Sequence, residues 1–368
     1  MDQQTEDFIK AGMEYEGSRK EPPENFPPLP DIPVQRYTDP DFFQLEMKNL
    51  WQNTWLYVAH DDQLPNPGDF LLFERGSAPI FLIRGNDGVV RAFFNTCRHR
   101  GAPIVQEESG NKRGLMCGYH GWTYNLEGDL INLRDKRDFV GLDMSCRSLY
   151  NVRCEKYGNF IFINENSDAE PLLDYLGPFV KDFDEMQPDK LRFVERHGFE
   201  VKCNVKVFMD AFLEVYHIKS IHPQTLDPVF DHRGTHITLW EKGHSRMVIP
   251  SRDESLLAHA AEGFKEIDTD GETARTTSCT YNIFPNLTAH IDHTGAPLLT
   301  FWPVDIETTW VEIHWMTPDL DGAPLPDIWK ERISQLDIVL GEDIQFMHTI
   351  QKAMQYGVFK RLPPFTFI

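Results

Sequence analysis

The sequence predicts an α+β fold of two domains, in which an all-β domain comes first and a larger domain with a long C-terminal helix follows. The chain has 368 residues, more than one small core usually accommodates. Short apolar runs separated by Gly, Asp, Asn and Pro fill much of the first half and are typical of strands. The C-terminal region instead carries apolar side chains at helical spacing.

Residues 1–39 are expected to form an N-terminal arm that packs on the larger domain. The arm begins with a short acidic helix and continues through "EPPENFPPLPDIPV", residues 21–34. The prolines of this stretch exclude a regular helix or a central strand. We therefore expect an irregular segment that lies over the surface.

Residues 40–165 are expected to form the all-β domain. A helical pattern, "FFQLEMKNLWQNTW", leads into the runs "GDFLLFERG", "APIFLIRG", "GVVRAFFNT" and "GNFIFINEN". Each run is short, apolar or alternating, and bounded by turn-forming residues, which favours strands.

Residues 166–368 are expected to form the larger domain. A strand-like run, "RFVERHGFEVKCNV", is followed by a helical stretch, "KVFMDAFLEVYHIKS". Three more strand patterns come later, and a helix begins near Pro326. Strands followed by a long terminal helix indicate an α+β domain.

Composition excludes several classes of partner. The net charge is −21, from 36 basic and 57 acidic residues, so phosphate backbones repel the chain and nucleic acid is not expected as a partner. No apolar run approaches the roughly 20 residues of a membrane span. The N-terminus shows no secretory pattern, and six cysteines are too sparse for a disulfide scaffold, so we expect a cytoplasmic location.

Two mixed pairs of metal-binding residues lie in the β-domain. Cys97 and His99 form a C-x-H pair, and Cys117 and His120 form a C-x2-H pair after a gap of 17 residues. Zinc is one interpretation, although in zinc sites each closely spaced pair usually consists of two cysteines or of two histidines. Mixed pairs suit a Rieske [2Fe–2S] cluster better, because two thiolates hold one iron and two imidazoles hold the other. The remaining cysteines are expected to be ordinary buried thiols.

The stretches "CRHRGAP" and "CGYHGW" resemble the large (alpha, terminal oxygenase) subunit of Rieske non-heme iron ring-hydroxylating oxygenases. The resemblance covers nearly the whole chain. It implies a Rieske [2Fe–2S] domain at 40–165. It also implies a catalytic domain at 166–368 of the helix-grip (Bet v 1-like) type, which holds a mononuclear Fe(II).

The mononuclear iron needs its own ligands, and His217 and His222 are the candidates. Positions five apart on a straight helix point about 140° away from each other, so the helix must loosen between them. Two imidazoles and one carboxylate form the facial triad that leaves positions open on Fe(II). The resemblance places the carboxylate in an "ED" pair on the C-terminal helix, which indicates Asp343; Asp337 is the alternative.

Glu214 precedes His217 by three residues, so on a helix the two share a face. The resemblance implies a catalytic role for an acid here, hydrogen-bonded to an iron-ligating histidine and to a cluster histidine of the neighbouring subunit. Most ring hydroxylases carry Asp at this position. Glu resembles the branch that acts on quaternary amines such as carnitine, although "DAFLEVYH" departs from that branch's pattern at Asp210 and Ala211.

The resemblance implies an oxygenase that uses O2 to hydroxylate or dihydroxylate a small-molecule substrate. Electrons would come from NAD(P)H through a separate reductase or ferredoxin, because the chain has no nicotinamide or flavin signature. They would pass along His120, Glu214 and His217, and a head-to-tail homotrimer would shorten that path. An aromatic or other apolar ring compound is the expected substrate. Alternatives are a monooxygenase or demethylase of a methylated amine, and a Rieske electron carrier without catalysis.

Residues 224–302 are expected to supply some of the substrate pocket. Aromatic side chains there can enclose a cation or line an apolar pocket. Basic side chains suit an anionic substrate. The aromatic candidates are Phe230, Trp240, Phe264, Tyr281, Phe284, Phe301 and Trp302, and the basic candidates are Arg233, Lys242, His244 and Arg246.

Overall fold

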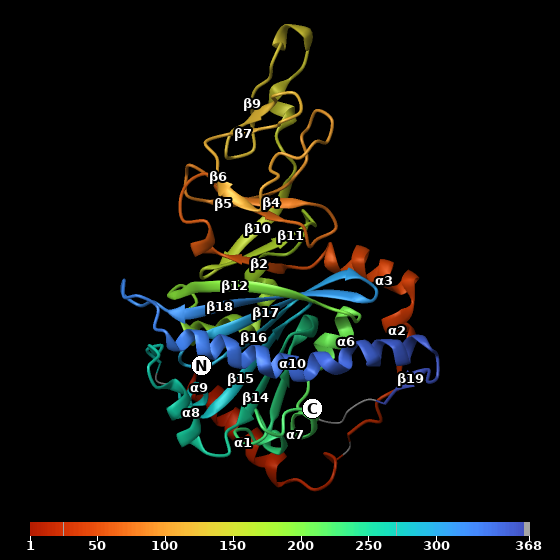
Figure 1. Ribbon diagram of the computed structural model, residues 1–368, viewed down its shortest axis with the longest axis vertical. Coiled ribbons are helices and arrows are strands. Elements are labelled where there is room, and N and C mark those ends of the chain that lie inside the picture. The colour runs from red at the N-terminus through yellow and green to blue at the C-terminus, as the bar shows by residue number, and fades with distance from the viewer. Residues whose placement is uncertain (25, 270, 364–368) are drawn as a thin grey trace. The chain divides into compact units, whose positions relative to one another are not determined.

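The computed structural model of the protein describes residues 1–24, 26–269 and 271–363 (Figure 1). The chain divides into two compact units. Glu46–Leu172 forms one, called the β-unit here. Met1–Leu45 and the chain from Leu173 onward form the other, the helix-grip unit. Within these described ranges, no helix is both long and apolar enough to cross a membrane.

The β-unit is built on an antiparallel sheet in the order β2-β11-β10-β5-β4-β3-β6. Its strands are β2 (Leu56–His60), β3 (Asp69–Phe73), β4 (Ile80–Arg84), β5 (Val90–Phe94), β6 (Ser109–Asn111), β10 (Asn151–Tyr157) and β11 (Phe160–Asn164). The four apolar runs named from the sequence become β3, β4, β5 and β11, so those strand predictions are confirmed. β4 and β11 are buried along their whole length, which explains their near-continuous apolar character.

A second, smaller sheet of the β-unit runs in the order β7-β8-β9. It consists of β7 (Leu115–Met116), β8 (Thr123–Tyr124) and β9 (Leu130–Asn132). A core cluster of buried residues includes Phe81, Phe93, Leu115 and Tyr124, together with the thiol of Cys97. The two cysteine–histidine pairs therefore lie on loops that a common apolar core supports.

The helix-grip unit contains an antiparallel sheet in the order β12-β18-β17-β16-β15-β14-β13. The strands are β12 (Leu191–Val201), β13 (His236–Leu239), β14 (Ser245–Pro250), β15 (Thr277–Ile283), β16 (Leu287–Ile291), β17 (Ala296–Asp305) and β18 (Thr308–Pro318). From β14 to β18 each strand pairs with the next along the chain, whereas β12 joins at the far edge beside β18.

The long C-terminal helix α10 spans Ile328–Gln355 and lies across this sheet in Figure 1. Its buried positions include Leu340, Asp343, Met347, Gln351 and Met354, which follow one another at spacings of three and four. One side of α10 therefore faces the protein interior, and that side carries a carboxylate. A long helix held across a curved antiparallel sheet is the helix-grip arrangement that the resemblance implies.

The remaining helices are short except at the N-terminus. They are α2 (Gln35–Thr38), α3 (Pro40–Glu46), α4 (Leu172–Leu176), α5 (Pro178–Phe183), α6 (Val205–Asp210), α7 (Ile218–Ile221), α8 (Glu254–Ala261) and α9 (Thr273–Thr276). The predicted helix after Phe42 is α3, followed by a π-helical turn at Met47–Trp51. Further on, β1 (Ile32–Pro33) pairs with β19 (Arg361–Leu362), which ties the proline-rich arm to the end of the same unit.

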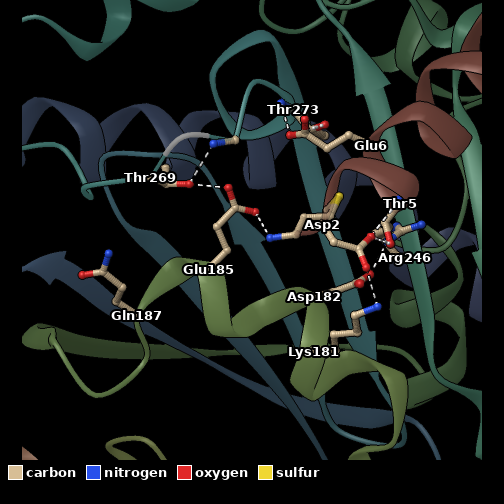
Figure 2. A network of polar contacts seen from close by, with 12 residues as sticks. Asp2, Thr5, Glu6, Lys181, Asp182, Glu185, Gln187, Arg246, Thr269 and Thr273 are labelled. Atoms are coloured by element: carbon tan, nitrogen blue, oxygen red, sulfur yellow. Dashed lines mark hydrogen bonds and ion pairs between the residues drawn. The ribbon is translucent and has the colours of Figure 1, made fainter.

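The first helix, α1 (Gln3–Ser18), packs on the helix-grip unit through polar contacts (Figure 2). Lys181 on α5 donates to Asp2 at 2.6 Å, and Glu6 accepts from the backbone and hydroxyl of Thr273 at 3.4 Å each. The same region holds the buried ion pair of Asp182 and Arg246. Arg246 is thus engaged inside the protein.

Candidate metal sites and the adjoining cavity

The two cysteine–histidine loops of the β-unit share one backbone design. The N–H of Cys97 donates to the carbonyl of Ala102 at 2.8 Å, and the N–H of Gly101 donates back to the carbonyl of Cys97 at 2.9 Å. Cys117 repeats both bonds with the residues at the same offsets, Trp122 and Gly121, at 2.8 and 3.0 Å. Both glycines have φ near +75°, at 78° and 74°, a conformation that glycine adopts without strain.

The side chains of these loops converge. The rings of His99 and His120 are 4.5 Å apart, and His99 stacks on Trp122 at 5.0 Å. Burial raises the pKa of Cys97, and the neighbouring thiol of Cys117 raises it further. The backbone N–H of Arg98 donates to the Tyr124 hydroxyl at 3.0 Å, and that hydroxyl lies 3.4 Å from the Cys97 sulfur.

This arrangement fits a two-iron cluster. Two buried thiols side by side are poorly stable as thiolates without a metal, because burial and mutual repulsion oppose their charge. Nδ1 of His99 is buried and has no hydrogen-bond partner in the described part of the chain, so it is free to bind a metal. The donor set of two sulfurs and two imidazoles is the one that a Rieske cluster requires.

Outside the quartet, the expectation for the other cysteines is only partly met. Cys203 and Cys279 are buried, and burial raises the pKa of each thiol to about 12. Cys154 is half-buried. Cys146 is exposed, so its predicted burial was wrong: it lies in a surface turn where Asp143 accepts a hydrogen bond from the thiol.

His217 and His222 do not lie on one continuous helix, which corrects the prediction for residues 206–220. α6 ends at Asp210, a turn follows, and the histidines flank the single-turn helix α7. Glu214 explains the break, because its carboxylate accepts hydrogen bonds from the backbone N–H groups of Tyr216 and His217. The interruption brings the two imidazole rings to 5.3 Å, edge to face.

His217, His222 and Asp343 form a group whose candidate ligand atoms all lie within 4.8 Å of one another. Nε2 of His217 is 3.8 Å from Oδ1 of Asp343, and Nε2 of His222 is 3.4 Å from the same oxygen. Asp343 projects from the buried side of α10, and His222 is 1% exposed. Three ligands on neighbouring elements leave room for further ligands on a metal ion, as a facial triad requires.

Each imidazole of this group is oriented by its own carboxylate. Nδ1 of His217 lies 2.7 Å from Glu214, and Nδ1 of His222 lies 2.7 Å from Glu342. Because Nδ1 is bonded to a carboxylate in each ring, Nε2 is the atom left for a metal. Burial alone would lower the pKa of His222, but its bonds to Asp343 and Glu342 outweigh burial and raise that pKa.

The alternative ligand Asp337 is placed elsewhere. Its carboxylate lies 3.1 Å from Nε2 of His197 on β12, in a half-exposed ion pair. Gln351, two turns after Asp343 on α10, accepts from the backbone N–H of Asn204 at 2.9 Å. Asn204 caps α6, so Gln351 ties α10 to the segment that leads to the histidines.

A cavity of about 390 Å³ reaches Thr225 and Val339, near the three-residue group, although none of those three residues lines it. Thr225 lines the cavity, and its hydroxyl donates to Glu342 at 2.7 Å, the same carboxylate that orients His222. Val339, one turn before Asp343, lines it as well. Much of the wall is hydrocarbon and includes Leu226, Phe230, Ile291, Trp315 and Leu336. Such a wall suits an apolar guest.

The candidate pocket residues from the sequence lie in different places. Phe230 lines the cavity, but Tyr281, Phe301 and Trp302 are packed in the core. Among the basic candidates, Arg246 is paired with Asp182, while His244 is buried and bonded to the carbonyl of Tyr175. Arg332 on α10 lines the cavity instead. Its position on the helical face of Asp343 was the signal that could have identified it.

Comparisons with known proteins agree with this geometry. Residues 54–146 match the family model of the Rieske [2Fe-2S] domain, and residues 188–366 match that of the ring hydroxylating alpha subunit (catalytic domain). The large oxygenase component of the 2,4-dinitrotoluene dioxygenase system from Burkholderia sp. (strain RASC) is 37% identical over 52% of this chain and 44% of its own length. The carnitine monooxygenase oxygenase subunit of Escherichia coli (strain K12) is 34% identical over 56% of this chain and 57% of its own length. The matched region thus spans about half the length of these relatives.

Solved structures show the same fold. A quaternary ammonium Rieske monooxygenase in complex with L-carnitine superposes with a TM-score of 0.76 at 23% identity, over 91% of this chain and 92% of that one. Naphthalene 1,2-dioxygenase with indole bound superposes with a TM-score of 0.72 at 24% identity, over 89% of this chain and 81% of that one.

Proposed function

The chain belongs to the family of Rieske ring-hydroxylating oxygenase alpha subunits, and on that premise we propose that it is a terminal oxygenase acting on an aromatic or other apolar ring compound. The observation that carries the proposal is the group of His217, His222 and Asp343 beside a largely hydrocarbon cavity. We propose that Cys97, His99, Cys117 and His120 hold the [2Fe–2S] cluster and that the three-residue group holds Fe(II). When bound, the cluster supplies single electrons and the mononuclear iron supplies open positions for O2 beside the substrate.

The protein's own residues keep the iron site ordered. Glu214 and Glu342 fix the orientation and tautomer of the two ligand imidazoles. Asp343 supplies the negative charge of the site from a buried position on a rigid helix. The largely apolar cavity wall suits an apolar substrate.

Glu214 is proposed to bridge two subunits. Its side chain is 21% exposed although it is bonded to His217, so part of that side chain is reachable from outside. A carboxylate has lone pairs for about four hydrogen bonds, and it can accept another from His120 of a neighbouring copy of this chain. A head-to-tail homotrimer would repeat that contact at each interface. Electrons would come from a separate reductase or ferredoxin.

A methylated amine is the second candidate substrate. The similarity to a carnitine monooxygenase subunit supports it, and so does Glu in place of the more usual Asp at position 214. Against it, the acidic group that lines the cavity, Asp292, is paired with Arg332 at 2.6 Å. The charges of Asp292 and Arg332 compensate each other, so a cation gains little from Asp292, and a ligand is distinguished here by the hydrogen-bonding groups that the pair leaves unused. A non-catalytic electron carrier would need neither the three-residue group nor the cavity.

The test is O2 uptake by the iron-replete protein with a surrogate reductase. The panel contains neutral ring compounds, aromatic acids and methylammonium compounds, and products are identified by mass. We expect ring products that contain one or two added oxygen atoms. The Asp343→Ala variant serves as the matched control, because the reductase should still reduce its cluster but no product should form. Oxidation of methylammonium compounds alone would replace this proposal by the second candidate.

A further inference from the structure

One face of α10 carries both the proposed iron ligand and side chains that line the cavity. Arg332 and Leu336 line the cavity on the helix that carries Asp343. From Arg332 to Asp343 the helix makes about three turns with about 20° left over, so the two side chains share a face. They are separated by about 16 Å along the helix axis. The cavity thus extends from Arg332 toward Val339 and Thr225, near the three-residue group.

The guanidinium of Arg332 is held in a fixed position. The rings of Phe264 and Trp329 lie 5.0 and 5.2 Å from it. Nη2 donates to Asp292 at 2.6 Å, and Nη1 donates to the hydroxyl of Thr294. Aromatic contacts with both rings and two hydrogen bonds orient the group before any ligand arrives, which lowers the entropic cost of binding.

Arg332 has more hydrogen-bond donors than its contacts use. A guanidinium carries five N–H groups, and the contacts in the described part of the chain use two of those of Arg332. Asp292 is more fully occupied, because Oδ1 accepts from the backbone N–H and the hydroxyl of Thr294 and Oδ2 accepts from Arg332. Most of the hydrogen-bonding groups that remain unused are therefore N–H donors of Arg332, and these suit a ligand that accepts hydrogen bonds.

We propose that the substrate is an elongated ring compound that carries a carboxylate at one end. Arg332 is then a specificity-determining residue that binds the carboxylate, while the apolar body extends along Leu336 and Val339 toward the iron site. The Arg332 side chain and the bound metal each span part of the separation of about 16 Å along α10, which leaves room for a molecule on the order of 10 Å long, such as a two-ring acid. A single-ring acid cannot occupy both ends at once. This inference rests on the proposed oxygenase function and specifies its substrate class.

The test uses the iron-replete holoenzyme with three probes: biphenyl-4-carboxylate, biphenyl and benzoate. Binding is measured by calorimetry without reductant, and kcat and KM are measured with a surrogate reductase. We expect the wild-type protein to bind biphenyl-4-carboxylate more tightly than either other probe. Arg332→Gln should weaken its binding roughly 10- to 100-fold, the range for losing a charge-assisted hydrogen bond, and should raise KM more than it lowers kcat.

Two further variants make the result specific. Arg332→Lys should recover part of the affinity, because it returns the charge without the planar pair of donors. Arg192→Gln is the matched control, because that arginine pairs with Asp319 at 2.7 Å on β12 and does not line the cavity. Equal losses for biphenyl and its acid in Arg332→Gln would overturn the inference and leave Arg332 as a structural anchor, with the oxygenase function intact. Tight binding of the acid without oxidation of any probe would instead contradict the oxygenase function.

Discussion

The two proposed metal sites differ in how the chain builds them. The cluster site takes its four side chains from two short loops that repeat the same pair of backbone hydrogen bonds around Cys97 and Cys117. The mononuclear site takes two histidines from the ends of α7 and a carboxylate from α10, more than a hundred residues later. The first site depends on local loop geometry. The second depends on how a helix packs across a sheet.

This difference predicts where each site is vulnerable. A change in a cluster loop should disturb only the cluster, because the loops are closed on themselves. A change in the packing of α10, or in Glu342, which orients His222, should disturb only the mononuclear iron. The predictions below test that independence, beginning with the largest expected effect.

Replacing either site's key ligand should abolish turnover through loss of one metal. Asp343→Ala should keep the brown colour and the electron-resonance signature of the cluster but lose the mononuclear iron. Cys117→Ala should lose the cluster. Iron analysis and electron resonance on the same samples separate the two. Asp337→Ala is the control for the first variant, because Asp337 faces His197. Iron loss in Asp337→Ala with retention in Asp343→Ala would show that the ligand assignment is wrong.

The next largest effect is expected for Glu214→Gln, which should keep both metals and lose most multiple turnover. Gln has nearly the same shape but cannot accept hydrogen bonds from two imidazole N–H groups with a full negative charge. We expect a loss of roughly 100-fold in turnover, from an effect of a few kcal/mol on two charge-assisted bonds. Glu214→Asp should recover part of it. Rapid mixing follows cluster reduction and cluster-to-iron transfer separately, and normal transfer in Glu214→Gln would remove the bridging role.

Glu342→Gln should act on the metal rather than on transfer. Glu342 orients His222 and accepts from Thr225, so its charge holds Nε2 toward the metal. Loss of such an orienting carboxylate typically lowers metal affinity about 10- to 100-fold. Competition with a chelator measures this directly. Glu331→Gln, one of the other carboxylates of α10, is the control, and an equal effect there would indicate a general charge effect along the helix.

The smallest effect is expected at the cluster's edge. Tyr124→Phe removes the hydroxyl beside the Cys97 sulfur and should lower the reduction potential by about 20–60 mV, which corresponds to one hydrogen bond of ordinary strength. The direction follows because a donor to sulfur stabilises the more negative, reduced cluster. Redox titration provides the measurement. An unchanged potential would show that the hydroxyl does not donate to the sulfur, and mononuclear iron content should stay constant in either case.

The sequence was most informative where the structure is local. The strands of the β-unit could be predicted, and the quartet of Cys97, His99, Cys117 and His120 could be proposed as cluster ligands, because their signals lie in short, contiguous segments. The continuity of the helix before His217 was predicted wrongly, because the Glu214 carboxylate takes backbone N–H groups that a helix would need. A helical pattern of apolar residues does not reveal that competition.

Long-range features required the fold. Asp343 was identified through a resemblance, because nothing in its neighbouring sequence connects it to the histidines. The orienting role of Glu342 and the position of Arg332 at the cavity depend on which strands α10 crosses. Tyr281 and Trp302 were candidates for the pocket, but both are packed in the core. Alternation along a strand shows which side chains share a face, but it does not show whether that face borders a cavity or the core.

Because Arg332 and Asp343 share a face of α10, the geometry of the helix sets the distance between the proposed anchor and the proposed iron ligand. The distance between reactive centre and anchoring charge can change only in steps, because side chains return to that face after about one turn, or roughly 5 Å. Exchanging Arg332 with Leu336 would shorten the span by one step and favour smaller acids. Inserting a single residue between Arg332 and Asp343 would rotate the anchor by about 100°, out of the cavity altogether. Substrate length is thereby tied to the pitch of an α-helix, and relatives of this chain can diverge in size preference by discrete intervals.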